Sequence, residues 1–447
     1  MTVAELHRPL GLTTITAALV VLVACSSGAG DATPTPSPSS AVDAVSRGGD
    51  FGPGVSATQI TLGMTNDLVR AGDTPYGAIT AAIQAYLMKV NDEDGGVCGR
   101  DVVLIARDDQ YEAKKALANT KELVEKQKVL AILGGPGVDV HKPAAVYLND
   151  PNGDGKKTDG IPDLFVSSGW ISWGDRATFP WVVGSLPDYA TDARIQAHYI
   201  MRELKGKKVG ILHSSDAFGQ SYLRGLKEAL KPAKLLVTAQ KYDPSAGGLK
   251  ANVLALREAG AQIVLLAVSP GTTAQAMKTA KAEGYKPRWL LSYANSPSLI
   301  ARELGGGIRA DQLTAGFNNL NGAITTKYLL STIDDEKSPA IVDHRRIMVT
   351  YGGPNPISSL TVEGQSIAEL TVETLRRACD DLTREGVRRA AESITGFSPS
   401  LFARGVEVNL SASDHYAIQT LQPVEIQAAG LTRGLGAPIS LDPTVTP

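Results

Sequence analysis

The sequence predicts an α/β fold in two lobes, each built around a parallel sheet. Short apolar runs bounded by turn residues alternate with segments in which apolar residues recur at spacings of three and four. Strands that crossover helices bury on both faces have this continuous apolar character. The alternation runs up to Pro187 and then restarts, which indicates two units of the same kind.

The first unit is expected to begin with a buried strand at 59–64. Thr74 and Pro75 then provide a helix N-cap and a first-turn proline, and apolar residues continue at helical spacing to Val90. The other elements expected in this unit are strands at 102–106, 129–133 and 164–167 and a helix at 112–127.

The second unit repeats this order. Its expected helices lie at 190–204, 221–230, 249–259 and 272–283, and its expected strands at 209–212, 235–239, 263–268 and 289–291. Ligands of open parallel sheets bind beyond the carboxyl ends of the strands. The candidate loops are rich in hydroxyls, glycines and aromatics, and they span 65–73, 134–139, 167–172, 214–219, 269–273 and 293–296.

The N-terminus has the layout of a bacterial export signal, with Arg8 followed by an uncharged run from Leu10 to Ala24. The Leu-Val-Ala-Cys sequence that ends in Cys25 looks like a lipobox, at which the cysteine is joined to diacylglycerol before cleavage. We therefore expect residues 1–24 to be a lipoprotein signal peptide and Cys25 to carry the lipid, since two or more acyl chains give lasting attachment. The alternative is an ordinary secretory signal with an incidental cysteine.

Residues 25–57 are rich in Ser, Gly, Pro and Ala, and such a composition predicts a flexible linker because it buries too little apolar surface to fold. In the whole chain, 44 Lys and Arg nearly balance 46 Asp and Glu, and no basic run is present. This balance argues against nucleic acid or a membrane surface as the partner and favours a small molecule.

The strand-end loops contain no recognisable catalytic set, since the sequence has no Gly-x-Ser-x-Gly elbow, no Walker loop and no His-Glu-x-x-His. The histidines lack ligand spacing and are expected to be surface or packing residues. Gly134 to Gly137 could cradle an anion at a helix N-terminus. Because the dinucleotide spacing is missing, a tight turn that approaches a ligand is the better interpretation. We expect neither catalysis nor a cofactor.

One loop resembles a calcium site in part. Asp150, Asn152 and Asp154 place side-chain oxygens at alternate positions ahead of Gly155, as calcium loops require. The position at which an EF-hand has its bidentate glutamate is Ile161. A solvated Asp/Asn/Gly loop is the default interpretation, and calcium is the weaker alternative.

Several short segments occur in a characteristic order. They are Val90-Asn91 followed by Gly95 to Arg100, then Asp108-Asp109, Asp216 to Gly219, Gly284-Tyr285 and Leu382 to Gly386. No one of them is specific, but their order and spacing are. By these segments the chain from about Ile60 to Gln427 resembles the branched-chain amino acid and amide group of type I periplasmic binding proteins, the solute receptors of ABC importers.

The resemblance implies two Rossmann-like lobes joined by a three-stranded hinge. Lobe 1 would comprise residues 58–186 and 318–404, lobe 2 residues 187–317 and 405–430, and residues 431–447 a C-terminal tail. The crossings would then fall near residues 186–188, 316–318 and 405. Cys98 and Cys379 both map to lobe 1, so a disulfide between them is expected in an oxidising compartment.

The resemblance also implies a solute site between the lobes. Members that bind amino acids hold the carboxylate with hydroxyls from two loops of lobe 1 and the amine with an acid from lobe 2. Those positions fall here at Val138, at Ser168 to Ser172 and near Asn295, so two of the anchors are absent. An amide, a short acid or another small polar molecule therefore fits as well as an α-amino acid.

The candidate ligand residues lie at or near strand-end or hinge loops. Arg70 could pair with an anionic group, with Asp67 and Asn295 left for amine or amide donors. Alternatively, Arg70 and Asp67 pair with each other. Trp170 and Phe218 would stack on the solute and exclude water. The full set is Asp67, Arg70, Val138, Ser168, Gly169, Trp170, Ser172, Tyr189, Phe218, Ser269 and Asn295.

The expected function is that of an extracytoplasmic, lipid-anchored monomer that captures a small polar solute and delivers it to an ABC permease. Contact with the membrane would be through the lipid alone, and no nucleic acid is involved. The alternative is a sensor that presents its closed form to a membrane receptor, and an α/β enzyme is a remote one.

Overall fold

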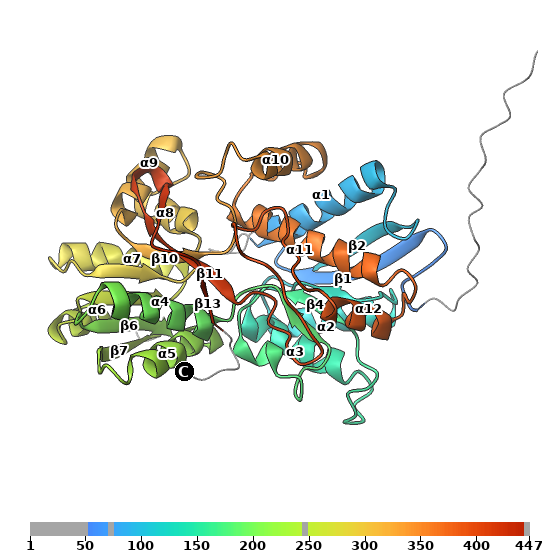
Figure 1. Cartoon of the computed structure of the whole chain (residues 1–447), viewed down its shortest axis with the longest axis horizontal. Coiled ribbons are helices and arrows are strands. Elements are labelled where there is room, and N and C mark those ends of the chain that lie inside the picture. Colours follow the sequence, from blue (N-terminus) through green and yellow to red (C-terminus); the bar gives the residue numbers. More distant parts are fainter. Residues whose placement is uncertain (1–51, 70–75, 244–248, 442–447) are drawn as a thin grey trace, which may run out of the picture. The chain divides into compact units, whose positions relative to one another are not determined.

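The structure, a computed structural model, describes residues 52–69, 76–243 and 249–441. These residues form two sheets, and one lobe is built on each (Figure 1). The sheet of lobe 1 is parallel, with the strand order β2-β1-β3-β4-β5. Its strands are β1 (Gln59–Asn66), β2 (Asp101–Asp108), β3 (Ile132–Leu133), β4 (Asp163–Val166) and β5 (Val182–Gly184).

The helices of lobe 1 come from two separate parts of the chain. They are α1 (Gly77–Asp94), α2 (Ala113–Glu125), α3 (Val138–Asn149), α10 (Pro339–Tyr351), α11 (Ser359–Arg377) and α12 (Arg384–Glu392). The late helix α11 lies against α1 (Figure 1). Gly364 permits this close approach, because a Cβ there would lie 2.4 Å from the carbonyl oxygen of Ile79.

The sheet of lobe 2 has the strand order β12-β11-β10-β9-β8-β6-β7, with β13 paired to β11. The strands from β6 to β10 are parallel, whereas β11 runs antiparallel to its neighbours. Their bounds are β6 (Val209–Ser214), β7 (Leu236–Tyr242), β8 (Ile263–Ala267), β9 (Arg288–Leu291), β10 (Ile324–Lys327), β11 (Thr420–Ile426), β12 (Thr432–Gly434) and β13 (Ile439–Ser440).

Helices cover both faces of this second sheet. They are α4 (Tyr189–Glu203), α5 (Ala217–Leu230), α6 (Leu249–Glu258), α7 (Pro270–Ala282), α8 (Pro297–Gly305) and α9 (Ala310–Leu320). Alternate residues of β8 point to opposite faces. Ile263 and Leu265 share a core with α4 and α5, while Val264 and Leu266 share another with α6 and α7. Burial on both faces therefore explains the continuous apolar run in the sequence.

The lobe boundaries differ from those expected at two of the three crossings. The first crossing lies between β5 and α4, as expected. The second comes after Lys327, because β10 pairs with β9 in lobe 2, so residues 318–327 do not belong to lobe 1. The third comes just before Thr420, because Val406, Val408 and Ile418 are buried in the core of lobe 1. Residues 431–441 are no free tail, since β12 and β13 pair with β11.

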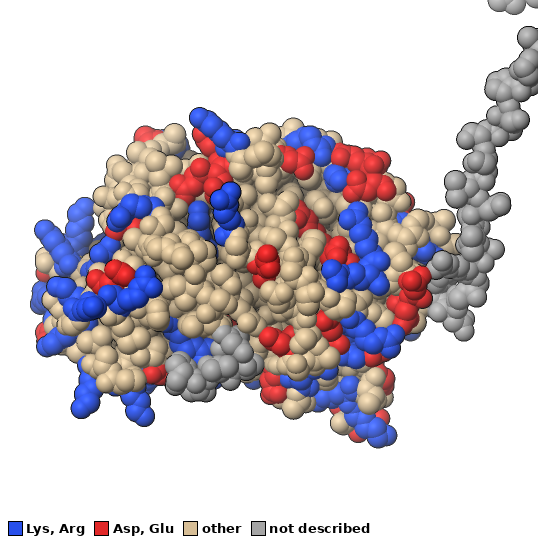
Figure 2. Space-filling view, in the orientation of Figure 1, with Lys and Arg blue, Asp and Glu red and all other residues tan. Residues whose placement is uncertain are grey.

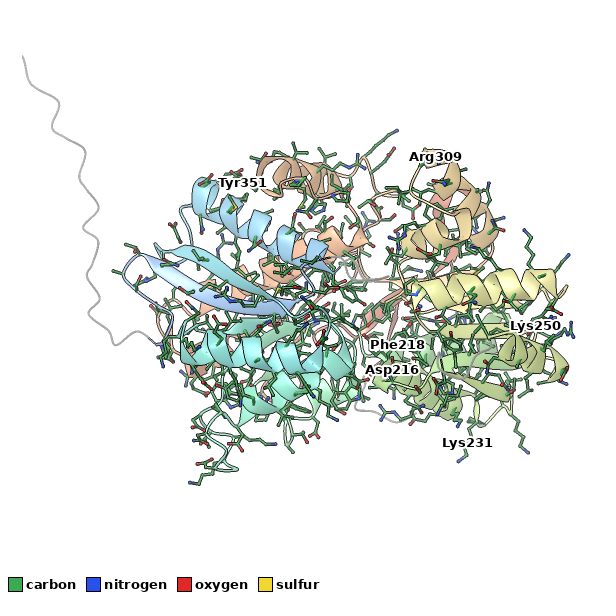
Figure 3. The ribbon with its side chains drawn as sticks, turned by 180° about the vertical axis from the view of Figure 1, so that it is seen from behind. Asp216, Phe218, Lys231, Lys250, Arg309 and Tyr351 are labelled. Carbon is green, nitrogen blue, oxygen red and sulfur yellow. A yellow bond between two sulfur atoms is a disulfide. The ribbon has the colours of Figure 1, made fainter. Side chains whose placement is uncertain are left out.

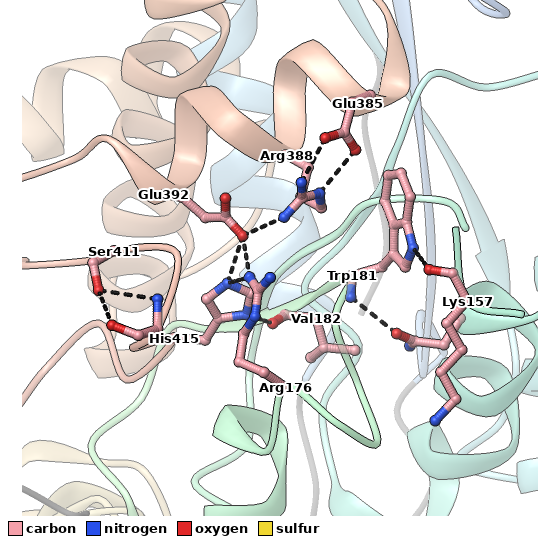
Figure 4. A network of polar contacts seen from close by, with 11 residues as sticks. Lys157, Arg176, Trp181, Val182, Glu385, Arg388, Glu392, Ser411 and His415 are labelled. Carbon is pink, nitrogen blue, oxygen red and sulfur yellow. Dashed lines mark hydrogen bonds and ion pairs between the residues drawn. The ribbon is translucent and has the colours of Figure 1, made fainter. Parts of the chain in front are cut away.

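A polar network attaches the chain before β11 to lobe 1 (Figure 4). His415 Nδ1 donates to the carbonyl oxygen of Val182 at 2.6 Å, and its Nε2 lies 3.0 Å from Glu392 Oε1. Arg388 donates to the same Glu392 oxygen at 2.5 Å, and Arg176 forms an ion pair with Glu392. This network and the buried apolar residues around it explain why residues 405–419 belong with lobe 1.

Cys98 and Cys379 form a disulfide, with Cα atoms 5.5 Å apart. The bond joins the turn between α1 and β2 to the residues just after α11, and so links the two sequence segments of lobe 1. Across the described part of the chain, no helix has the length and apolar character needed to cross a membrane.

Candidate ligand-binding site

A cavity of about 620 Å³ lies between the lobes. Its lining residues follow β3 and β4 in lobe 1 and β6, β8 and β9 in lobe 2, at the carboxyl ends where parallel sheets bind ligands. Asp216 and Phe218, at the start of α5, lie on the side of lobe 2 that faces lobe 1 (Figure 3). The main lining residues used below are Tyr76, Tyr111, Val138, Ser167, Tyr189, Asp216, Phe218, Ser269, Tyr293, Asn295, Tyr328 and Glu363.

Aromatic side chains from both lobes form much of the wall. The ring of Tyr189 lies 4.9 Å from that of Phe218 and 6.0 Å from that of Tyr293, measured between centroids. The Tyr293 and Tyr328 rings are 5.7 Å apart. Burial raises the pKa of Tyr76 to about 12 and raises the pKa of Tyr189, Tyr293 and Tyr328 as well. These phenols therefore stay neutral at physiological pH.

Several polar residues of the lobe 2 loops already serve the fold. Asp216 caps α5 by accepting from the Gly219 amide at 2.9 Å, and Ser269 caps α7 by accepting from the Thr272 amide at 3.3 Å. Asn295 Nδ2 donates to the carbonyl oxygen of Val268 at 2.5 Å. These bonds hold the first turns of α5 and α7 at the edge of the cavity.

Glu363 brings a carboxylate to the cavity from lobe 1. It lies in the first turns of α11, next to the glycine that lets α11 approach α1, and it accepts a hydrogen bond from Ser167 Oγ, which follows β4. Burial, offset only in part by the Ser167 hydrogen bond, raises the pKa of Glu363 to about 7. The cavity therefore contains an acidic group that titrates close to neutral pH.

The structure places five of the expected ligand residues in the cavity wall, namely Val138, Tyr189, Phe218, Ser269 and Asn295. Their contact with a solute remains a prediction. Asp67 is buried just beyond β1 and does not line the cavity. Arg70 lies outside the described residues.

The loop after β4 differs from what we expected. Ser168, Gly169, Trp170 and Ser172 do not line the cavity, because the chain turns away into the 3₁₀ helix η1 (Ile171–Gly174). Ser168 Oγ accepts from Trp173 Nε1 at 2.7 Å, and the Trp170 and Trp173 rings pack at 5.0 Å. Trp170 thus packs in an aromatic cluster with Trp173 and Phe179.

Gly169 instead supports the first crossing. Its carbonyl oxygen accepts from the Tyr189 amide at 2.8 Å, and a Cβ at Gly169 would lie 2.3 Å from the carbonyl oxygen of Pro187 and 2.6 Å from the Tyr293 hydroxyl. Only glycine leaves room for this contact between the lobes.

The glycine turn after β3 lies at the cavity and also packs against a protein side chain. It opens α3, and Gly137 has φ 80° at the N-cap. A Cβ at Gly137 would lie 2.4 Å from the Tyr111 hydroxyl, so the turn makes room for a protein side chain. Gly137 and Tyr111 both line the cavity.

Sequence reasoning missed Tyr76, Tyr111, Ser167, Tyr328 and Glu363. Tyr111 could have been found, because it follows the end of β2 and is an aromatic residue in a strand-end loop. Ser167 lay within a loop that we had selected. No sequence signal pointed to Glu363, because it lies within a helix and follows no strand end.

The candidate calcium loop is organised by its own amides. Asn152 Oδ1 accepts from the Asp154 amide at 3.0 Å, and Asp150 Oδ2 accepts from the Gly155 amide at 3.1 Å. Asp154 Oδ1 accepts from the Lys156 amide at 2.7 Å. Within the residues that the structure describes, no three His, Cys, Asp or Glu side chains are grouped to hold a metal ion. The bonds accepted by Asn152 and Asp154 have the form of Asx turns.

Two curated proteins match part of the chain. An amino acid binding protein of Pseudomonas aeruginosa is 27% identical over 180 residues, covering 38% of this chain and 43% of its own length. Leu/Ile/Val-binding protein homolog 3 of Brucella melitensis is 28% identical over 223 residues, covering 46% of this chain and 53% of its own. The chain thus spans about half the length of these relatives.

Solved structures share the fold over most of the chain. A branched-chain amino acid ABC transporter protein from Thermus thermophilus with bound valine is 21% identical, with a TM-score of 0.73 over 86% of this chain and 97% of that one. A fatty acid ABC transporter substrate-binding protein from Thermomonospora curvata is 24% identical, with a TM-score of 0.69 over 89% and 96%. The type I fold expected from the sequence is confirmed.

A family model described as periplasmic binding protein matches residues 59–431. This range takes in all of the helices named above and every strand except β12 and β13. The family description implies an extracytoplasmic location. The chain belongs to the periplasmic binding protein family.

Proposed function

We propose that this protein captures a small polar solute between its lobes and delivers it to an ABC permease. The observation that carries the proposal is the cavity of about 620 Å³, to which both lobes contribute. Small-molecule sites usually have volumes of about 300–1,000 Å³. Because each lobe supplies one part of the wall, closure of the lobes would enclose a solute and give a permease a distinct shape to bind.

The proposal does not include catalysis. The relatives and structures reported above are described as binding or transporter proteins, which supports a receptor role. Those descriptions name different ligands, amino acids and fatty acids. The solute of this chain must therefore be inferred from the residues of its own cavity.

We also propose that a lipid on Cys25 holds the protein at the membrane surface. Cys25 and most of residues 25–57 lie outside the described residues, so the proposal rests on the lipobox and the linker composition. A Cys25→Ser variant should leave the membrane fraction and lose the mass of the acyl chains. A variant that stays fully membrane-bound, or a parent protein that has no added mass, would refute lipidation.

The cavity is tested first by identifying what it holds. Mass spectrometry of small molecules released from gently purified protein names the solute, and calorimetry then measures its affinity. Thr272 lines the cavity in the first turn of α7, whereas Gln275 on the same helix is exposed. Thr272→Trp should fill the cavity and weaken binding at least tenfold, and Gln275→Trp should leave it unchanged.

Both variants must melt within a few degrees of the parent, so that a loss of binding reports on the cavity. Equal affinity in both would place the solute elsewhere. For delivery, cells that lack the gene should regain uptake of the labelled solute with the Gln275→Trp protein but not with Thr272→Trp. Uptake that does not depend on the gene would refute the transport role.

A further inference from the structure

Glu363, which is partly exposed, differs from two buried carboxylates of the described chain, Asp192 and Glu369. Asp192 accepts hydrogen bonds from Tyr222, Thr326 and Gln196, and Glu369 accepts from both Ser400 and Gln365. The hydrogen bond that Glu363 accepts is to its Oε1, from Ser167, and among the described residues it forms no ion pair. The fold supplies Asp192 and Glu369 with several donors, whereas Glu363, which lines the cavity, accepts from Ser167.

This arrangement destabilises the empty protein. The pKa of Glu363 is about 7 because burial disfavours the charge, and this lies above the ordinary value for glutamate. A carboxyl whose pKa is higher in the folded state lowers stability once the pH rises above its unfolded pKa, and the full loss is present above pH 7. A group that destabilises the fold in this way is typical of a binding site.

Three tyrosines line the cavity together with Glu363. Burial is the main cause of the raised pKa of Tyr76, Tyr189 and Tyr328, and the nearby charge of Glu363 raises each of them further. These three residues come from the start of α1, the start of α4 and the chain after β10, and all three line the same cavity as Glu363. Aromatic rings attract organic cations through their faces, and this attraction adds to that of a carboxylate.

The charge of the cavity wall as a whole is negative, like that of Glu363. The described lining residues include the acids Asp139, Asp216 and Glu363 and the single base Lys327, which gives −3 + 1 = −2 when all are ionised. Lys327 Nζ already lies 3.9 Å from Asp334 and 3.8 Å from Asp335. On the face seen in Figure 2, many Lys and Arg residues of lobe 2 lie along its outer edge, away from lobe 1. An anionic solute would meet like charge here, and a cation would meet opposite charge.

We propose that Glu363 is the group that binds a protonated amine of the solute, with Ser167 holding the carboxylate in place. The solute would then be an organic amine with an apolar body and no carboxylate of its own. This inference rests on the proposed function, because it uses the same cavity. It places the acid that binds the amine in lobe 1, on α11, whereas the resemblance suggested an acid in lobe 2.

A matched series of four probes tests the solute class at pH 8. These are 2-phenylethylamine, which is a cation, the neutral 2-phenylethanol, the zwitterion phenylalanine and the anion 3-phenylpropionate. In calorimetry we expect 2-phenylethylamine to bind at least tenfold more tightly than the other three. Binding of phenylalanine or phenylpropionate as tight as that of the amine would overturn the proposal. So would a lack of binding of 2-phenylethylamine at 10 mM, because this concentration is well above the dissociation constant of a weak site, about 1 mM.

Variants on α11 test the residue. Glu363→Gln should weaken 2-phenylethylamine at least tenfold and leave 2-phenylethanol unchanged. Glu369→Gln, on the same helix but outside the cavity wall, should change neither. An amine affinity that Glu363→Gln does not alter would overturn the assignment.

A measurement without any ligand separates binding from a structural role. If Glu363 serves the solute, Glu363→Gln should raise the melting temperature of the empty protein at pH 8, because the buried charge is removed. A fall in melting temperature would indicate a structural role and overturn the proposal. The proposed function has its own test, since Thr272→Trp can abolish binding of the released solute even where Glu363→Gln and the amine series have no effect.

Discussion

The disulfide between Cys98 and Cys379 should carry a large share of the stability of lobe 1. Replacing both cysteines by alanine removes a cross-link between residues separated by 281 positions. The loop-closure relation for so long a loop gives about 5–6 kcal/mol from the entropy of the unfolded chain alone. Measured values for disulfides are usually smaller, at about 2–4 kcal/mol, because the unfolded chain retains structure. We expect a loss of about 2–5 kcal/mol for the double variant.

Urea unfolding followed by circular dichroism measures this loss. The parent protein in excess reductant serves as the control and should match the double variant, because both lack the cross-link. The denaturant dependence should also be steeper without the bond, since the uncross-linked chain exposes more surface on unfolding. A loss below about 1 kcal/mol in both samples would show that the packing of α11 on α1 closes lobe 1 without help from the bond.

Four further predictions concern single residues. Phe218→Ala should weaken the released solute at least tenfold, or about 1.4 kcal/mol, in calorimetry, because Phe218 lines the cavity. Trp170→Ala should lower the melting temperature but keep the affinity for the solute. A loss of affinity as large as that of Phe218→Ala would contradict this. Gly169→Ala should lose about 1–3 kcal/mol of stability in urea unfolding, since its Cβ would lie 2.3 Å from a backbone oxygen, and parent-like stability would count against this reading. Burial raises the pKa of Glu392, but hydrogen bonds from His415 and a nearby arginine outweigh this and hold the pKa below its usual value. The stability that Glu392 contributes is therefore present above its unfolded pKa and is lost as the pH falls. Glu392→Gln should make the melting temperature fall less steeply between about pH 5 and 3. A pH profile identical to that of the parent would refute this.

Much of the fold could be predicted because its central strands are buried on both faces. The run at β8 is continuously apolar, and the amphipathic segments at α4 and α7 have clear helical spacing. The segment α3 was not predicted as a helix, since it follows a glycine-rich turn and contains Pro143. The strands β10 to β13 were not predicted. Of these, β12 and β13 are antiparallel additions to β11 of only three and two residues, too short to give an apolar pattern.

The candidate site could be predicted only where it follows directly from strand order. The rule that ligands bind beyond strand ends located Val138 and Phe218, because each is near a strand in the sequence. The same rule wrongly included Trp170, since it does not tell which way a loop turns. Glu363 reaches the cavity on a helix that returns to lobe 1 after the second crossing, so its position depends on tertiary packing that no local pattern reports.

The order of the segments along the chain limits when the protein can fold. Lobe 1 needs Val406 and Ile418 for its core, and lobe 2 needs β11, which begins at Thr420. A growing chain therefore lacks an essential piece of both lobes until nearly all of it has emerged from the ribosome. Such a chain would remain unfolded for most of its synthesis, which suits passage through a narrow translocation pore. It follows that truncation anywhere before Val406 would remove core residues of lobe 1 and the strand β11 of lobe 2 together.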